Sequence, residues 1–445
     1  MYDSIVIEGK NRPTVTFVFE HFVNDAQSAA SSKGMPVIRV VPETVVSEST
    51  VIEDIEASIT AVADDMVNAL TRPLTAEEKS PRPREPEKPA RIVFKGSLEE
   101  VNRFFYKRGW TDGLPIIPPT EEAIAEMLTG TDLPANHLVA ELEPRRGKAT
   151  VEKIAINAVM AGALPTYMPL LIAGVQALAA NASPGMMAAS TGSWAPFWLI
   201  NGPISKDLQI SSSFGAMSPG NIANATIGRA MGLITKNIRG IRKQIEDMGV
   251  LGNPGKYSLV AAENEEFCPW EPMHVEHGFS KADSTITLTF PQSFQQMVPY
   301  GTDDKGLLAT VVTSITQARM GLFALILTPP NAKSLASRGW TKKKIKDFII
   351  ENARFTEDNY SKFSGGNGWL LSKNGPTGQR DSHVIFRVTQ REPEPVQVYV
   401  FGGFGSWIGF LQGGPQPIIK KVELPANWNQ LVGKYKNIVP TYVRY

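Results

Sequence analysis

Thr14-Val-Thr-Phe-Val-Phe19 is an apolar, β-branched run of the kind that forms a buried strand. A second run of this kind, residues 36–41, follows a helical pattern over residues 21–32. Strand, helix and strand in this order are typical of parallel sheets covered by helices. The stretch therefore predicts an α/β fold that begins with a small parallel α/β layer.

A proline-rich segment ends this first layer. Residues 53–70 continue the layer with an amphipathic helical pattern, and Ser80-Pro-Arg-Pro-Arg-Glu-Pro-Glu-Lys-Pro89 then places four prolines in ten residues. Proline at this density favours an extended, semi-rigid linker. We predict a small, incomplete α/β domain over residues 1–78, a linker over 79–93, and a larger mixed α/β domain over 94–445 that holds the candidate active site.

Apolar strands and helical patterns alternate through the larger region. Ser97-Leu-Glu-Glu100 has the capping-box pattern that starts a helix. Helical spacing is expected over residues 150–160, 167–180, 306–318 and 341–355. Strands are expected over residues 197–200, 284–290, 322–328, 383–389 and 396–401. This order indicates an α/β or α+β domain, neither a helical bundle nor a sandwich.

The composition excludes several classes of protein. The chain has 445 residues, of which 42% are hydrophobic and 20% charged, as in ordinary globular proteins. A net charge of +1, without basic runs interleaved with aromatics, gives no reason to expect nucleic acid as a partner. Neither a signal peptide nor an apolar stretch long enough to span a bilayer is expected. We expect a cytoplasmic protein with no membrane partner.

The most informative motif for ligand binding is Ser218-Pro-Gly-Asn-Ile-Ala-Asn224, at the predicted start of a small-residue helix. Backbone N–H groups at a helix start have no partner inside the helix and can hold an anion or a carbonyl oxygen. Ser218, Gly220, Asn221 and Asn224 are therefore candidate substrate-binding residues. The alternative is that Asn221 is only an N-cap and that Asn224 packs against a neighbouring loop.

A second candidate segment, residues 263–277, has the highest density of groups that move protons or bind metal. Glu265 and His274 are candidates for general acid–base catalysis, because a structured loop can bury a carboxylate and raise its pKa. Glu271, His274 and His277 form a weaker candidate set for a divalent metal, since the spacing lacks the helical His-Glu-x-x-His pattern. These side chains alternatively join the loop to its neighbours or to another subunit.

Two further residues are candidates for contacts with the substrate. Thr191 and Asn201 flank a predicted buried strand, and ligand contacts in α/β proteins often lie at strand ends. Asn201 alternatively serves as a turn residue. Cys268, the single cysteine, is a nucleophile only if a base lies nearby, and otherwise a small apolar filler. No P-loop or dinucleotide fingerprint is present, which disfavours ATP and nicotinamide chemistry.

Four separate sequence motifs follow one another along the larger region. They are Thr150-Val-Glu-Lys-Ile-Ala-Ile-Asn-Ala-Val-Met-Ala-Gly162, Asn224-Ala-Thr-Ile-Gly-Arg-Ala230, Leu251-Gly-Asn-Pro-Gly-Lys-Tyr257 and Pro269-Trp-Glu-Pro-Met-His-Val-Glu-His277. Together they resemble the UGSC family of bacterial (seleno)proteins, named for a Sec/Cys-Gly-Ser-Cys motif. The resemblance covers most of residues 95–445, and the first ninety residues look like the later part of the family's small α/β domain.

The sequence departs from that family at its thiol chemistry. No Gly-Ser-Cys motif occurs, and the chain begins where the motif is expected to have passed already. Ala163 stands where relatives are expected to carry a cysteine, and Asn331 where a histidine is expected. Either a small partner chain supplies the thiol and completes the sheet beside Thr14, or this chain works with Asn, Glu and His alone.

We therefore expect an enzyme that converts a small polar organic carboxylate or carbonyl compound by acid–base chemistry. The reaction would be an elimination, a hydration or a hydrolysis, so the enzyme would be a lyase or hydrolase. One alternative is the large subunit of a hetero-oligomer, a thiol-dependent reductase or lyase whose small partner chain carries the catalytic thiol or selenol. Another is a non-catalytic structural subunit. An oligomer is expected, and no cofactor is identified.

Overall fold

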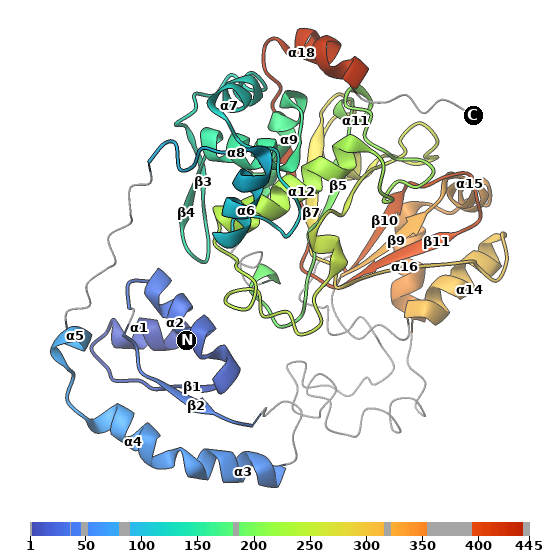
Figure 1. Cartoon of the computed structure of the whole chain (residues 1–445). Helices are drawn as coiled ribbons and strands as arrows, with labels where there is room; N and C mark the ends of the chain where they lie inside the picture. Colours follow the sequence, from blue (N-terminus) through green and yellow to red (C-terminus); the bar gives the residue numbers. More distant parts are fainter. Residues whose placement is uncertain are drawn as a thin grey trace.

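The computed structural model describes residues 2–35, 37–45, 52–79, 90–180, 187–315, 322–353 and 394–438. Most of the expected linker and the whole strand expected over residues 383–389 lie outside these ranges. The chain has an α/β fold, with a small parallel layer at the N-terminus and a larger mixed part (Figure 1). Among the described residues, no helix combines the length and the apolarity needed to cross a bilayer.

The small unit contains the expected strand–helix–strand. β1 (Thr16–Phe19) pairs in parallel with β2 (Val40–Glu43), and α2 (Val23–Ser32) connects them. Strand β2 begins four residues later than predicted. The other helices of this unit are α1 (Tyr2–Glu8), α3 (Ile52–Ala61), α4 (Ala63–Thr71) and α5 (Ala76–Lys79). The helix predicted over residues 53–70 is therefore divided in two, at Val62.

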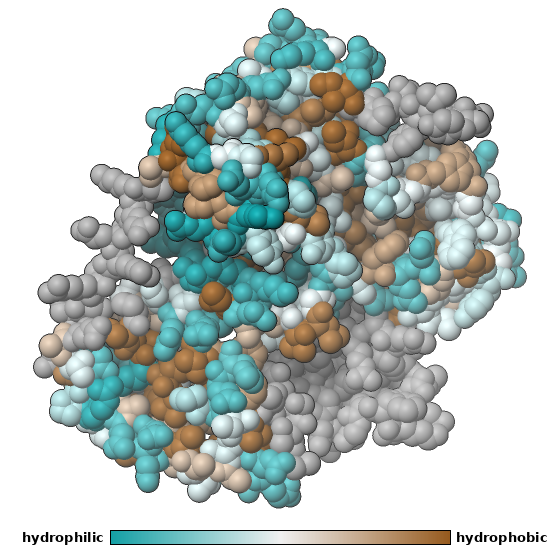
Figure 2. Space-filling model, viewed as in Figure 1, coloured by the Kyte–Doolittle hydropathy of each residue, from teal (hydrophilic) through white to brown (hydrophobic). Residues whose placement is uncertain are grey.

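Apolar residues gather on the surface of the small unit, which lies at the lower left of Figure 2. Its exposed large apolar side chains are those of Val6, Ile7, Ile52, Ile59, Val67, Leu70 and Leu74. A two-stranded sheet buries too little apolar surface to be stable without further packing. This unit therefore depends on contacts beyond its own sheet.

Two four-stranded mixed sheets form the larger part. The first has the order β12-β7-β5-β6, made of β5 (Phe197–Asn201), β6 (Val260–Ala262), β7 (Thr285–Thr289) and β12 (Ile418–Lys421). The second has the order β10-β9-β11-β8, made of β8 (Ser293–Met297), β9 (Phe323–Leu327), β10 (Val396–Val400) and β11 (Ile408–Gln412). Only the pairs β5–β6 and β9–β10 are parallel within these sheets.

The two sheets pack face to face, and helices cover their outer faces. On β5, Phe197 and Leu199 face the second sheet, whereas Trp198 and Ile200 face helices. The first sheet is covered by α8 (Val151–Ala161), α9 (Met168–Ala179) and α12 (Ile222–Asn237). The second is covered by α14 (Asp304–Ile315), α15 (Pro329–Ser337) and α16 (Lys342–Asn352) (Figure 1). Strands of this kind are apolar on both faces, because one face meets the other sheet and the other face meets helices, as expected for an α/β domain.

The remaining α-helices and strands lie outside the two four-stranded sheets. They are α6 (Leu98–Lys107), α7 (Glu121–Leu128), the hairpin of β3 (Leu138–Leu142) and β4 (Gly147–Thr150), α11 (Ile204–Asp207), α13 (Met273–Glu276) and α18 (Trp428–Tyr435). Helix α6 begins with the predicted capping box, in which Ser97 Oγ accepts from Glu100 N–H and the Glu100 carboxylate accepts from Ser97 N–H.

Candidate functional site

The parallel pairing of β5 and β6 brings two predicted residues together. Asn201 is the last residue of β5, and Glu265 comes three residues after the end of β6. Asn201 Nδ2 donates a hydrogen bond to Glu265 Oε1 at 3.0 Å, and the backbone N–H of Gly202 donates to the same oxygen at 2.7 Å. Two donors on one oxygen fix the orientation of the Glu265 carboxylate.

Glu263 lies beside Glu265 but has no access to solvent. Its side chain is fully buried, and its carboxylate accepts from Asn201 Nδ2 at 2.7 Å and from the backbone N–H of Met273 at 2.7 Å. The backbone N–H of Val400, at the end of β10, also donates to Glu263, at 3.4 Å. The Glu263 carboxylate, which follows β6, therefore contacts residues of β5, β10 and α13 at once. Its role is to position Asn201, which in turn holds Glu265.

The buried counter-ion of Glu263 is Lys342, the first residue of α16. Lys342 Nζ lies 3.3 Å from Glu263 Oε1 and 2.8 Å from Glu276 Oε2, and it donates to the backbone carbonyl of Glu271 at 2.8 Å. Burial lowers the pKa of Lys342, but the carboxylates of Glu263 and Glu276 raise it more, and the net direction is upward. Lys342 is therefore a cation at neutral pH.

His274, the second predicted proton-transfer residue, is completely buried beside this cluster. Its Nδ1 lies 3.9 Å from Glu265 Oε1, and neither ring nitrogen has a hydrogen-bond partner among the described residues. Asn201 Oδ1 and the hydroxyls of Thr285 and Tyr399 are likewise buried without a partner in the part of the chain that the structure describes. Unpaired buried polar atoms cost about 1–3 kcal/mol each, so a group of them calls for a physical explanation.

Three exposed aromatic side chains from segments that follow the strands of this cluster contact one another. Phe214, Phe267 and Phe404 are 72%, 48% and 51% exposed, and they come from segments that follow β5, β6 and β10. The ring of Phe404 lies 4.9 Å from that of Phe267 and 6.1 Å from that of Phe214. Gly403 permits this approach, since a Cβ there would lie 2.1 Å from the Phe214 ring. These three rings therefore form a small exposed aromatic cluster.

Asn221 and Asn224 do not present their amides to a shared ligand in this structure. Asn221 Oδ1 caps α12 by accepting from Asn224 N–H at 3.1 Å, and Asn221 Nδ2 donates to the Gln209 carbonyl at 2.8 Å. Asn224 is buried; its Oδ1 accepts from Ser211 N–H at 2.8 Å, while its Nδ2 lies 3.0 Å from the Val260 carbonyl. The alternative of an N-cap and a packed asparagine therefore describes this segment better than the predicted receptor does.

The remaining predicted substrate-binding residues are Thr191, Ser218 and Gly220. Ser218 and Gly220 are exposed residues of the turn before α12. Thr191 comes before β5, whereas Asn201 is its last residue. A five-residue strand is roughly 13 Å long, so the strand separates Thr191 from Asn201. Thr191 instead accepts, through its carbonyl, a hydrogen bond from Val250 N–H. The structure thus brings together Asn201, Glu265 and His274, whereas Thr191 lies before the opposite end of β5.

The three residues of the weaker metal set have separate surroundings in this structure. Glu271 is exposed, His277 Nδ1 lies 2.8 Å from the Met273 carbonyl, and His274 lies toward Glu265. Within the described residues, no group of three His, Cys, Asp or Glu side chains has a geometry that could hold a metal ion. Cys268 is half-buried, and burial, with a smaller effect of Glu263, raises its pKa to about 11. The thiol is therefore protonated at neutral pH.

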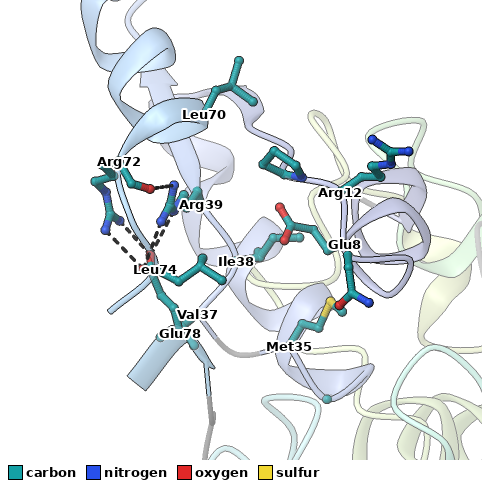
Figure 3. A pocket seen from close by; sticks show the side chains of 13 residues that line it. Glu8, Arg12, Met35, Val37, Ile38, Arg39, Leu70, Arg72, Leu74 and Glu78 are labelled. Atoms are coloured by element: carbon teal, nitrogen blue, oxygen red, sulfur yellow. Dashed lines mark hydrogen bonds and ion pairs between the residues drawn. The ribbon is translucent and has the colours of Figure 1, made fainter. Parts of the chain in front are cut away.

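A separate pocket of about 550 Å³ lies in the small unit (Figure 3). Arg39 and Arg72 both point at Glu78 there, and Arg39 Nε and Arg72 Nη2 lie 3.1 Å and 2.7 Å from Glu78 Oε1. Glu8 accepts from Thr14 N–H at 2.7 Å. Since these charges satisfy one another, the pocket is a weaker candidate than the cluster around Glu265.

Comparison of the chain with protein-family models, with curated proteins and with solved structures found no match. The UGSC resemblance thus stays an expectation from sequence motifs. At the two departures from that family, Ala163 is buried, and Asn331 is a buried residue of α15 whose Nδ2 donates to the Trp407 carbonyl at 3.0 Å.

Proposed function

We propose that this chain is an enzyme that transfers protons to and from a small polar organic substrate with a carbonyl or carboxylate group, and that Glu265 is the acid–base residue. The observation that carries the proposal is the asymmetric environment of Glu265. One oxygen is held by Asn201 and Gly202, and the other has no hydrogen-bond partner among the described residues. The side chain is 24% exposed, so that oxygen can meet a ligand from solvent.

In this proposal Glu265 takes a proton either from a substrate carbon, in an elimination, or from water, in a hydration or hydrolysis. The carboxylate becomes a carboxylic acid, and the same proton then returns to the leaving group or to the product. We further propose that His274, which is completely buried and whose Nδ1 lies 3.9 Å from Glu265 Oε1, relays the proton and does not contact the substrate. Glu263 acts as a positioning residue because it holds Asn201, and Lys342 acts through Glu263 as its buried counter-ion.

The experiment replaces Glu265 by Gln and uses Glu266→Gln as the matched control. Glu266 is the next residue, its side chain is 60% exposed, and it pairs with Lys206 on the surface. A panel of small carboxylates and hydroxy acids is incubated with enzyme in D₂O, and NMR follows loss of carbon-bound protons and appearance of products. We expect Glu265→Gln to slow the reaction by about 10²–10⁴-fold with an unchanged melting temperature, and Glu266→Gln to react normally. Equal rates in the two variants would exclude Glu265 as the base.

The second candidate function is that of a large subunit in a complex. The observation that favours it is the small unit, whose described sheet has only two strands and whose surface carries several exposed apolar side chains. Native mass spectrometry of the protein from its own cells tests it. A stoichiometric small chain, with activity lost on alkylation of that chain's thiol, supports the complex. A homo-oligomer with intrinsic activity contradicts it.

A further inference from the structure

A cavity of about 210 Å³ lies at the amino end of β5, at the opposite end of that strand from Glu265. Trp194 and Pro196, which lead into β5, form one wall. Gly232, Thr235 and Lys236 on one face of α12 form another wall, since residues three and four apart lie side by side on a helix. Drug-sized ligands occupy roughly 300–1,000 Å³, so this cavity fits a smaller molecule.

The charged side chains of the cavity leave a surplus of positive charge. Lys236, Lys243 and Lys256 line it together with Asp112 and Asp247. Both carboxylates already have a cation. Arg229 binds Asp112 with two hydrogen bonds, of 2.8 Å and 3.0 Å, and Lys256 Nζ lies 2.7 Å from both oxygens of Asp247.

Two ammonium groups therefore remain without a carboxylate. Lys236 Nζ donates to the Thr111 carbonyl at 2.6 Å, and neither Lys236 nor Lys243 forms an ion pair among the described residues. Lys236 is half-buried, and burial lowers its pKa, with Asp112 opposing that change. A partly desolvated ammonium without a counter-ion gains free energy when an anion binds beside it.

The rest of the lining is apolar and partly aromatic. Trp194, Phe290 and Ile241 line the interior, and Tyr257, which is 53% exposed, lies where the cavity opens to solvent. Flat rings of this kind bury a large apolar area of a ligand at low cost in side-chain entropy. An apolar wall beside two unpaired ammonium groups matches a ligand with a flat apolar body and one anionic group.

We propose that this cavity is a second ligand site, and that it binds a small organic anion with a flat apolar body. The two lysines bind the anionic group, and the aromatic wall packs against the body. The site shares no residue with the cluster around Glu265, so it stands independently of the proposed reaction.

Isothermal titration calorimetry of the full chain tests the proposal with benzoate, its neutral isostere benzamide, and acetate. We expect benzoate to bind at least about tenfold more tightly than either control, because one charge-assisted contact contributes about 1.4 kcal/mol or more. Lys236→Met/Lys243→Met should weaken benzoate about tenfold or more, whereas Lys343→Met, at a lysine that is 83% exposed on α16, should not. Added salt should weaken benzoate and leave benzamide unaffected.

Equal affinities for benzoate and benzamide would overturn the proposal, as would full benzoate binding by the double variant or no binding of benzoate to the unmodified chain. Circular dichroism verifies that the double variant is folded. If it is not, Lys243→Met alone replaces it, because Lys243 is exposed and its loss leaves the core unchanged.

Discussion

Glu246 joins the small N-terminal unit to the larger part of the chain, and its substitution by Gln tests that junction. Its side chain is 4% exposed. The carboxylate accepts from Ser28 Oγ on α2 at 2.5 Å, from Arg145 Nε at 2.8 Å, and from Arg242 Nε at 3.0 Å. The neighbouring Arg242 thus meets Arg145 and Ser28, which come from distant segments, on one buried carboxylate.

The pKa of Glu246 gives the magnitude of this contribution. Burial alone would raise that pKa, but the hydrogen bonds from Arg242 and Ser28 and the charge of Arg145 lower it from 4.5 to about 2. Each unit of difference between folded and unfolded states corresponds to about 1.4 kcal/mol. Because the folded-state pKa is depressed, the stabilisation is present above pH 4.5 and is lost as the pH falls toward 2. Glu246→Gln should therefore lower the free energy of unfolding at pH 7 by up to about 3 kcal/mol.

The pKa of Asp25, which lies on α2 with Ser28, is shifted in the opposite direction to that of Glu246. Burial, with a further contribution from Glu246, raises its pKa from 3.8 to about 6. A raised carboxyl pKa costs stability as the pH increases from about 4 to about 6, so Asp25→Asn should stabilise the protein at pH 7 by up to about 3 kcal/mol. The two substitutions thus form a matched pair on neighbouring carboxylates.

Urea unfolding followed by circular dichroism at pH 7, 5 and 3 measures both effects. The difference between the unmodified chain and Glu246→Gln should shrink from pH 7 to pH 3, and the gain from Asp25→Asn should vanish over the same range. A loss in Glu246→Gln that is equal at pH 7 and pH 3 would refute the reasoning, because it would come from packing and not from charge.

Two further predictions concern the candidate site. Lys342→Met should lower the free energy of unfolding by about 3–5 kcal/mol, because it leaves Glu263 buried without its cation. Lys343→Met, at the adjacent exposed lysine, should change the free energy of unfolding by less than about 0.5 kcal/mol. Denaturant unfolding of the two variants checks this prediction, and equal stabilities would contradict it. Cys268, with a pKa of about 11, should react with iodoacetamide at pH 7.5 at least about 100-fold more slowly than free cysteine, as mass spectrometry of the intact chain would show; rapid alkylation of the folded protein would contradict the buried, protonated thiol.

Strands that are buried on both faces could be predicted from the sequence, because they are continuous apolar runs. Strands β5, β7, β9 and β10 were predicted in this way, to within about two residues at each end. β6 was missed: Val260-Ala-Ala262 is three residues long and has two alanines, which favour strands weakly. β8 was missed because it is an exposed strand with a polar sequence, Ser-Phe-Gln-Gln-Met. The face-to-face packing of the two sheets has no local signal, since it depends on long-range pairing.

In the candidate site, too, local features could be predicted from the sequence and long-range pairing could not. Asn201, Glu265 and His274 were each selected from local composition, and the fold brings them together because β5 pairs in parallel with β6. Strand β6, which the sequence did not predict, is the element that aligns these three residues, so their proximity could not be predicted. Lys342 had no signal either, because it lies 79 residues from Glu263 and resembles its surface neighbours Lys343 and Lys344 in sequence.

The choice between Glu263 and Glu265 as the reactive carboxylate also required the fold. Both follow the same short strand, and in sequence they are equivalent. In the structure the Glu263 carboxylate accepts from a side-chain amide, two backbone N–H groups and an ammonium, and no part of its side chain is exposed. Glu265 is held through one oxygen only and reaches solvent. A saturated carboxylate stabilises its surroundings, whereas a half-saturated, oriented one retains a lone pair for a proton, so Glu265 is the residue on which the chemistry should depend.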